Sequence, residues 1–198
     1  MNILIVYAHP NPRSFNAALR DVAVETLSQA GHTVVISDLY AMGFDPVLET
    51  QEIGGNLRPD ARAEVLKVRQ SDLLLFQFPD WWYGMPAILK GWIERVFAYG
   101  FAYDETHEYE SGLLRGKKAL LSLTVGGPPE YFRQAPQREL MRVLEPIHYG
   151  YFAFVGMEVL PPFIVYGPSK MSQAERKKVL EDYREYLRGI PKLEPLRF

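Results

Sequence analysis

Short apolar runs alternate with amphipathic stretches along this chain, and the alternation predicts strands joined by helices. The apolar runs cover 2–8, 33–39, 72–78, 118–124 and part of 156–166. Apolar positions at helical spacing predict helices over 15–30, 59–70, 86–97, 131–149 and 172–187. Strands and helices that alternate at these lengths are typical of an α/β fold, with parallel strands and helices on both faces of the sheet.

We expect one domain over residues 1–198, built on a five-stranded doubly wound sheet in the order 2-1-3-4-5. The third run is apolar enough to be buried on both faces, as a central parallel strand is. In this order a ligand crevice opens beyond the carboxyl ends of the first and third strands. The loops at 9–16 and 79–84 then flank the crevice, and the loop at 124–131 reaches the same edge. A long loop, 40–58, follows the second strand.

The chain contains no cysteine, which excludes disulfides, thiolate nucleophiles and zinc–thiolate sites. Any redox chemistry therefore depends on a bound cofactor. The formal net charge is −2 and the basic residues are scattered among acids, which argues against a nucleic-acid partner. No two histidines have the spacing of metal ligands, so we expect no metal. The first apolar run is short and lacks a basic segment before it, so we expect a cytoplasmic protein without a transmembrane segment.

The first loop ends where a helix is predicted to begin, and it offers groups that bind phosphate. It contains no glycine and matches neither the GxGxxG nor the P-loop pattern. Ser14, Phe15 and Asn16 stand where unpaired N–H groups and the positive end of a helix dipole can hold a phosphate, with His9 nearby. Ordinary helix capping by Ser14 explains the same residues, and this loop alone leaves both interpretations open.

The second loop carries three adjacent aromatic residues, Trp81, Trp82 and Tyr83, before Gly84. Three large rings in a row cannot all point into one core, so at least one faces a pocket, a partner chain or solvent. Gly84 permits a tight turn, and flat aromatic walls beside backbone amides suit the tricyclic ring of a flavin. A hydrophobic dimer patch is the alternative, and both interpretations can hold together.

The third loop contains Gly126 and Gly127 and is followed by Tyr131. The two glycine amides can donate to the pyrimidine edge of a flavin, where negative charge accumulates on reduction. The Tyr131 hydroxyl is in reach of that edge or of a substrate oxygen. A Gly-Pro turn with a tyrosine at a helix start is the alternative.

Four segments together resemble the flavodoxin-like NAD(P)H:quinone oxidoreductases of the DT-diaphorase type. They are YAHPNPRSFNAAL, SDLYAMGFDPVL, FQFPDWWYGMPAILKGWIERVF followed by GFAY, and KALLSLTVGG. The resemblance covers nearly the whole chain and implies a flavodoxin-like fold. It also implies a homodimeric flavoenzyme that binds FAD in preference to FMN. Such an enzyme takes a hydride from NADH or NADPH and passes it to a quinone in the same emptied site, in two-electron ping-pong turnover.

By position, the resemblance implies the parts of an FAD site. The pyrophosphate and adenylate side is formed by His9, Ser14, Phe15, Asn16 and Ala17, with Arg176 as a basic contact. The isoalloxazine wall is formed by Pro79, Asp80, Trp81, Trp82 and Tyr83. The pyrimidine edge is contacted by Thr124, Val125, Gly126, Gly127 and Tyr131, and the last three are the residues assigned to catalysis. One quinone cavity, shared by two chains, is lined by Trp82, Tyr103 and Phe154.

The chain departs from the family pattern at two positions. Gln137 stands where the family has a histidine, and an amide cannot act as a general acid near neutral pH, which leaves solvent or Tyr131 as the proton source. Asp80 stands where the family usually has an apolar residue. A competing function is a flavin-binding ancillary subunit of a glutathione-gated potassium efflux system, since relatives of this fold include such subunits. The long segment at 40–58 favours the enzyme.

Overall fold

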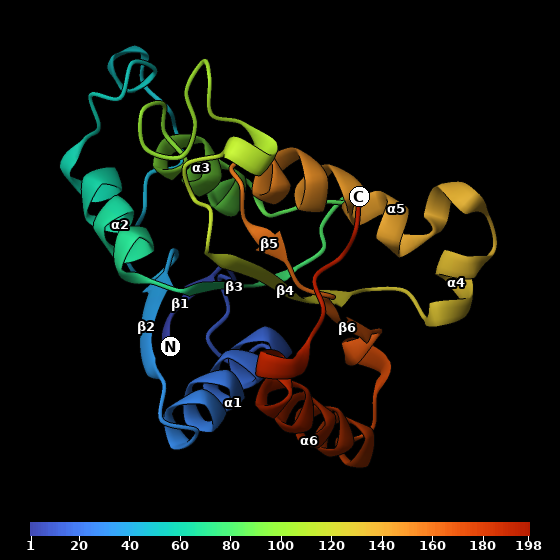
Figure 1. Cartoon of the computed structure of the whole chain (residues 1–198). Helices are drawn as coiled ribbons and strands as arrows, with labels where there is room; N and C mark the ends of the chain where they lie inside the picture. The colour runs from blue at the N-terminus through green and yellow to red at the C-terminus, as the bar shows by residue number, and fades with distance from the viewer.

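The computed structural model describes residues 1–198 and contains one parallel sheet between two layers of helices (Figure 1). The strands are β1 (Asn2–Tyr7), β2 (Thr33–Asp38), β3 (Leu73–Pro79), β4 (Lys118–Val125), β5 (Glu158–Val159) and β6 (Phe163–Tyr166). They pair in the order β2-β1-β3-β4-β5, and β6 also pairs with β4. This order confirms the doubly wound sheet predicted from the sequence.

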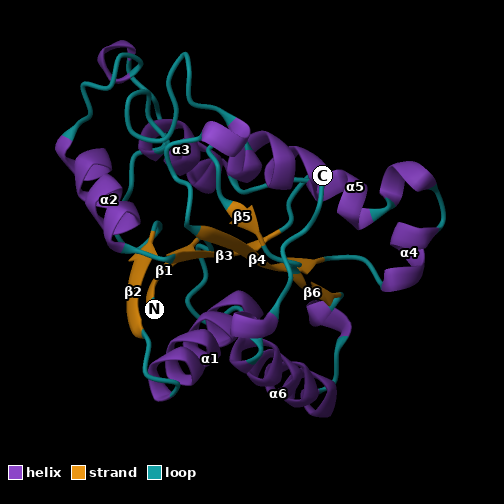
Figure 2. Cartoon of the chain, in the orientation of Figure 1, coloured by secondary structure: helices purple, strands orange, loops and turns teal.

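Helices cover both faces of the sheet (Figure 2). They are α1 (Phe15–Gln29), α2 (Pro59–Gln70), α3 (Ala87–Val96), α4 (Pro129–Arg133), α5 (Leu140–Ile147) and α6 (Gln173–Arg188). Successive strand residues point to opposite faces. Ile3 and Ile5 of β1 therefore pack with α1 and α6, whereas Leu4 and Val6 pack with α2, α3 and α5. None of the helices has the length and apolar character needed to cross a bilayer.

The fifth strand position is filled by two short strands instead of one. β5 pairs with the first two residues of β4, and β6 pairs with its last four. Pro161 and Pro162 lie between the two strands. Proline has no N–H to donate to a ladder, so pairing stops there and resumes at Phe163. The expectation of one strand within 156–166 is therefore corrected to two.

The helix expected over 131–149 is also broken. α4 ends at Arg133, a 3₁₀ turn covers Pro136–Arg138, and α5 begins at Leu140 and continues into a π-helical segment, His148–Ala153. Ala135 has extended backbone angles, φ −153° and ψ 146°, as the residue before a proline usually does. Pro136 thus separates α4 from α5, and α4 projects away from the sheet in Figure 1.

The long loop at 40–58 is tied to α3 by a buried ion pair between Glu52 and Arg95. Arg95, fully buried in α3, donates to Glu52 at 2.9 Å and to Asp60 of α2 at 2.7 Å. The hydrogen bond that Arg95 donates to Asp60 lowers the pKa of Asp60 to about 2. A 3₁₀ turn over Thr50–Glu52 places the Glu52 carboxylate in the cluster. The loop is thereby fixed against α2 and α3.

Candidate active site

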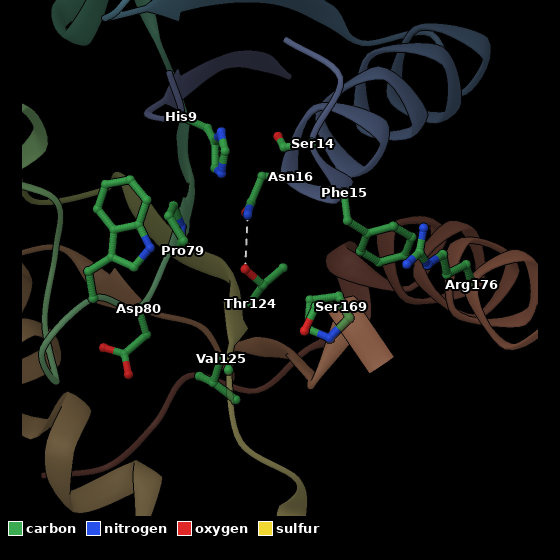
Figure 3. A pocket seen from close by; sticks show the side chains of 13 residues that line it. His9, Ser14, Phe15, Asn16, Pro79, Asp80, Thr124, Val125, Ser169 and Arg176 are labelled. Atoms are coloured by element: carbon green, nitrogen blue, oxygen red, sulfur yellow. Dashed lines mark hydrogen bonds between the residues drawn. The ribbon is translucent and has the colours of Figure 1, made fainter. Parts of the chain in front are cut away.

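A cavity of about 330 Å³ lies beyond the carboxyl ends of β1, β3 and β4 (Figure 3). The β1–α1 loop, the β3–α3 loop and the end of β4 all contribute to it, as the strand order predicted. Its lining consists of His9, Ser14, Phe15, Asn16, Pro79, Asp80, Trp81, Thr124, Val125, Gly126, Pro168, Ser169 and Arg176. The volume is in the range of small-molecule sites.

A buried polar network joins the start of α1 to the ends of β3 and β4 beneath the cavity. The Asn16 side-chain amide donates to the Thr124 hydroxyl at 2.9 Å (Figure 3). The Gln77 amide donates to Asn16 Oδ1 at 2.8 Å. All three residues are buried. Because α1, β3 and β4 each supply one member, the network fixes the three loops relative to one another.

The N-terminus of α1 faces the cavity with free donors. The Ser14 hydroxyl accepts the Ala17 N–H at 3.1 Å, which confirms that Ser14 caps the helix. The Phe15 and Asn16 amides lie in the first turn and have no acceptor within the helix. Capping and anion binding are therefore compatible here, because the cap uses one donor and leaves others exposed to the cavity.

His9 is held as a neutral donor at the other side of the first loop. Its Nδ1 accepts the Asn11 N–H at 3.0 Å, so the proton of the neutral ring is on Nε2. Burial lowers the pKa of His9. The ring packs 5.8 Å from the ring of Trp81, which brings the first two loops together.

Residues 81–84 form a tight turn whose two central residues are aromatic. Trp81 and Gly84 exchange backbone hydrogen bonds of 3.0 and 3.2 Å. Trp82 and Tyr83 have φ of +56° and +59°, the signs of a type I′ turn. Trp82 and Tyr83 therefore adopt the left-handed backbone conformation of this turn. Gly84, which was expected to permit the tight turn, only closes it through its hydrogen bonds with Trp81. Trp82 is 99% exposed.

Gly126 and Gly127 are glycines for different reasons. A Cβ at Gly126 would meet no atom within 4 Å, so protein packing does not require glycine there. A Cβ at Gly127 would come within 3.1 Å of the Phe132 ring and 3.3 Å of the Tyr131 ring. Gly127 thus lets the chain turn closely onto α4, and only Gly126 lines the cavity.

Tyr131 is linked to the second loop by its hydroxyl, which lies 3.1 Å from the Tyr83 hydroxyl. This hydrogen bond raises the pKa of Tyr83. The Arg138 guanidinium lies over the Tyr131 ring, 4.6 Å from its centre. Arg138 is therefore a permanent cation beside Tyr131. It follows Gln137, the residue at the position where the family resemblance implies a histidine.

Most of the residues assigned to an FAD site from the sequence line this one cavity. The exceptions are Ala17, which is buried under the α1 cap, and Trp82, Tyr83, Gly127 and Tyr131. Sequence reasoning missed Pro168 and Ser169, which follow β6 and Gly167. The loop after the last strand of a parallel sheet reaches the same edge as the loops after the first, third and fourth strands. Extending the prediction to that loop would have included Pro168 and Ser169.

Tyr103 and Phe154 lie apart from this cavity, with ring centres 5.4 Å from each other. They share a second cavity of about 330 Å³ with Leu48, Lys90, Ile93, Glu94, Phe97, Gly150, Tyr151 and Val155. Trp82 does not line it. Within one chain, the three residues assigned to the quinone cavity are therefore not brought together.

The flavodoxin-like fold family matches residues 1–187. This chain belongs to that family. Ribosyldihydronicotinamide dehydrogenase (quinone) from Pongo abelii is 42% identical over 98% of this chain and 94% of its own length. NAD(P)H dehydrogenase (quinone) 1 from Cavia porcellus is 39% identical over 98% of this chain and 79% of its own length. The resemblance stated from the four sequence segments is thereby confirmed.

Solved structures agree with this family membership. A putative quinone reductase from Klebsiella pneumoniae has a TM-score of 0.93 and 36% identity, covering 100% of this chain and 88% of its own. General stress protein 14 from Treponema denticola, solved in complex with FMN, has a TM-score of 0.73 and 25% identity, covering 96% of this chain and 99% of its own.

Proposed function

We propose that this protein is a flavin-dependent NAD(P)H:quinone oxidoreductase. The observation that carries the proposal is the single cavity built by the loops after β1, β3 and β4, in a chain whose relatives are quinone dehydrogenases. A flavin bound there supplies two-electron chemistry, accepting a hydride from a nicotinamide and delivering it to a quinone. Donor and quinone use the emptied site in turn, which makes the kinetics ping-pong.

The residues around the cavity fit a flavin. Pro79 and Trp81 supply a flat wall, and Gly126 leaves its amide accessible without a side chain in the way. The free amides of Phe15 and Asn16 suit the phosphate of the cofactor. Tyr131 and Gly127, outside the lining, act at the pyrimidine edge, where Tyr131 donates its hydroxyl hydrogen.

FAD is the preferred cofactor over FMN because a second hollow continues the first. Ser14, Phe15 and Arg176 line both the main cavity and an adjoining one of about 410 Å³. The adjoining hollow adds Arg13 and Lys177, so cations surround the path that a pyrophosphate and adenylate would follow. FMN would leave this second hollow empty.

The proposed enzyme acts in the cytoplasm as a homodimer of single-domain chains with shared sites. Trp82 is almost fully exposed beside one cavity, and Tyr103 and Phe154 line the other. A twofold dimer would bring Trp82 of one chain to the aromatic cavity of its partner. The quinone would then lie between them.

The test is to purify the protein, release its cofactor by heat and identify the cofactor by mass. Turnover is then measured with menadione and NADH, NADPH or dihydronicotinamide riboside, the last because of the Pongo abelii relative. We expect FAD, and parallel double-reciprocal lines when donor and quinone are varied together. A protein that binds neither FAD nor FMN would overturn the proposal. A flavoprotein with no turnover that co-purifies with a membrane transporter would favour the ancillary-subunit alternative.

A further inference from the structure

Arg138 is a half-buried cation that has no carboxylate partner in the chain. Its guanidinium lies over the Tyr131 ring, 4.6 Å from the ring centre. Its one hydrogen bond within the chain runs from Nη1 to the neutral Gln134 Oε1, at 2.8 Å. Arg142 in α5, by contrast, is paired with Glu139 at 3.1 Å. The positive charge of Arg138 is therefore left for a group outside the chain.

Tyr131 connects Arg138 to the main cavity. A Cβ at Gly127 would come within 3.3 Å of the Tyr131 ring, so the ring packs on the third loop. The Tyr131 hydroxyl lies 3.1 Å from the Tyr83 hydroxyl, in the second loop. Residues of both loops line the cavity. The Tyr131 ring thus spans the two loops at the cavity edge, and Arg138 lies on this ring.

The acids of the neighbouring loops do not neutralise Arg138. Glu130 is exposed and forms no ion pair. Asp80 forms no ion pair either, and its Oδ1 is buried without a hydrogen-bond partner. A guanidinium that keeps its charge and most of its N–H groups free is well suited to bind a phosphate or a carboxylate. We therefore expect a ligand anion at this edge of the cavity.

The phosphate of a bound flavin is already provided for at the other side of the cavity. The free amides at the start of α1 and the Arg176 side chain serve that phosphate, and Asp80 and Arg176 lie at opposite sides of the cavity in Figure 3. Arg138 is joined through Tyr131 to Tyr83, which belongs to the same tight loop as Asp80. The anion at Arg138 therefore belongs to a substrate and not to the cofactor.

The hydride donors divide by this chemistry. Dihydronicotinamide riboside carries no charge, whereas NADH and NADPH carry a phosphate one ribose away from the ring that gives up the hydride. Relatives of this chain are named both as ribosyldihydronicotinamide and as NAD(P)H dehydrogenases, so their names leave the donor open. We propose that Arg138 binds the phosphate of the donor, and that the protein prefers phosphorylated dihydronicotinamides to the riboside. The inference rests on the proposed function and names its donor class.

The test compares two donors that differ only in one phosphate, reduced nicotinamide mononucleotide and dihydronicotinamide riboside. With menadione as acceptor at low ionic strength, kcat/KM of the wild type should favour the mononucleotide by about tenfold, the worth of one hydrogen-bonded charge pair. The ratio should fall to near one in Arg138→Gln, and Arg138→Lys should keep part of it. Because both donors carry the same ring, any effect of a substitution on Tyr131 cancels in the ratio.

A matched control and a binding measurement support the comparison. Arg142→Gln removes the same charge from a paired arginine nearby, so it should keep the wild-type ratio. Calorimetric titration of the oxidised holoenzyme with nicotinamide mononucleotide needs no turnover. Its Kd should be about tenfold weaker in Arg138→Gln, and added salt should weaken binding to the wild type more than binding to the variant.

Three outcomes decide against the inference. A wild-type ratio near one, or an equal ratio in Arg138→Gln, would overturn it and leave the flavoenzyme proposal intact. An equal loss in Arg142→Gln would show that net charge alone sets the ratio, which would overturn it too. A flavin-loaded protein that turns over neither these donors nor NADH and NADPH would overturn both the inference and the proposed function.

Discussion

Trp82 and Tyr83 hold a backbone conformation that aromatic residues rarely adopt. A left-handed residue other than glycine costs about 1–3 kcal/mol, and such strain is concentrated at functional sites. The Trp82 side chain is almost entirely exposed, so packing within the chain does not repay that cost. We infer that the turn is kept for what its rings contact outside the chain.

The Trp82→Gly variant tests the strain. Glycine adopts φ of +56° freely, so the variant should be about 1 kcal/mol more stable toward urea than the wild type, while quinone turnover falls. The control is Trp81→Gly, which should lose stability because Trp81 has no left-handed backbone to relieve and its ring packs on His9. If Trp82 instead packs on a second subunit, Trp82→Gly should be less stable, with an unfolding midpoint that depends on protein concentration.

At the same scale, Tyr131 is the residue proposed to donate at the pyrimidine edge. Tyr131→Phe keeps the ring under Arg138 and removes only the hydroxyl. We expect flavin reduction or quinone reduction to slow by about a hundredfold to a thousandfold, the cost of one lost donor to developing charge. Stopped-flow measurement of each half-reaction checks this. Tyr149→Phe, an exposed tyrosine outside the main cavity, should leave both rates unchanged.

At the scale of elements, the hydrogen bonds among Asn16, Gln77 and Thr124 hold α1, β3 and β4 in register at the site. Asn16→Ala removes both bonds and leaves the Gln77 amide and the Thr124 hydroxyl unpaired. Chemical unfolding should show a loss of about 2–3 kcal/mol, and flavin binding should weaken because the three loops are no longer fixed together. Asn56→Ala, at an exposed asparagine, should change stability by less than about 0.5 kcal/mol.

Comparing the predicted and observed elements shows where the local sequence pattern was sufficient to predict a helix or strand and where it was not. The alternation of apolar and polar positions predicted β1, β3, β4, α1 and α2 to within two residues, because these periodicities follow directly from strand and helix geometry. It failed at the fifth strand and at α4–α5, where Pro161, Pro162 and Pro136 interrupt the ladder and the helix, although Pro146 lies within α5 without ending it. Closer attention to Pro136, Pro161 and Pro162 would have predicted both breaks.

At the scale of the whole molecule, the proposed dimer predicts that one quinone site uses residues of two chains. A heterodimer of Trp82→Ala and Phe154→Ala chains, purified with two different tags, should recover about half of the wild-type activity. One of its two sites would carry both substitutions and the other neither. Each homodimer should be impaired at both sites. A heterodimer no more active than the two homodimers would place both residues in the site of a single chain.

The sequence alone determined the sheet order, the edge at which the loops meet and most of the residues around the cavity. The sheet order and the common edge follow from strand periodicity and from the rule that parallel strands end at one edge, whereas several of the cavity residues, Arg176 among them, follow from the family resemblance. Only the tertiary structure decided the left-handed turn at Trp82 and Tyr83, the ion cluster of Arg95, and the buried, unpaired oxygen of Asp80. These depend on desolvation and on contacts between segments far apart in the chain, which no local pattern encodes.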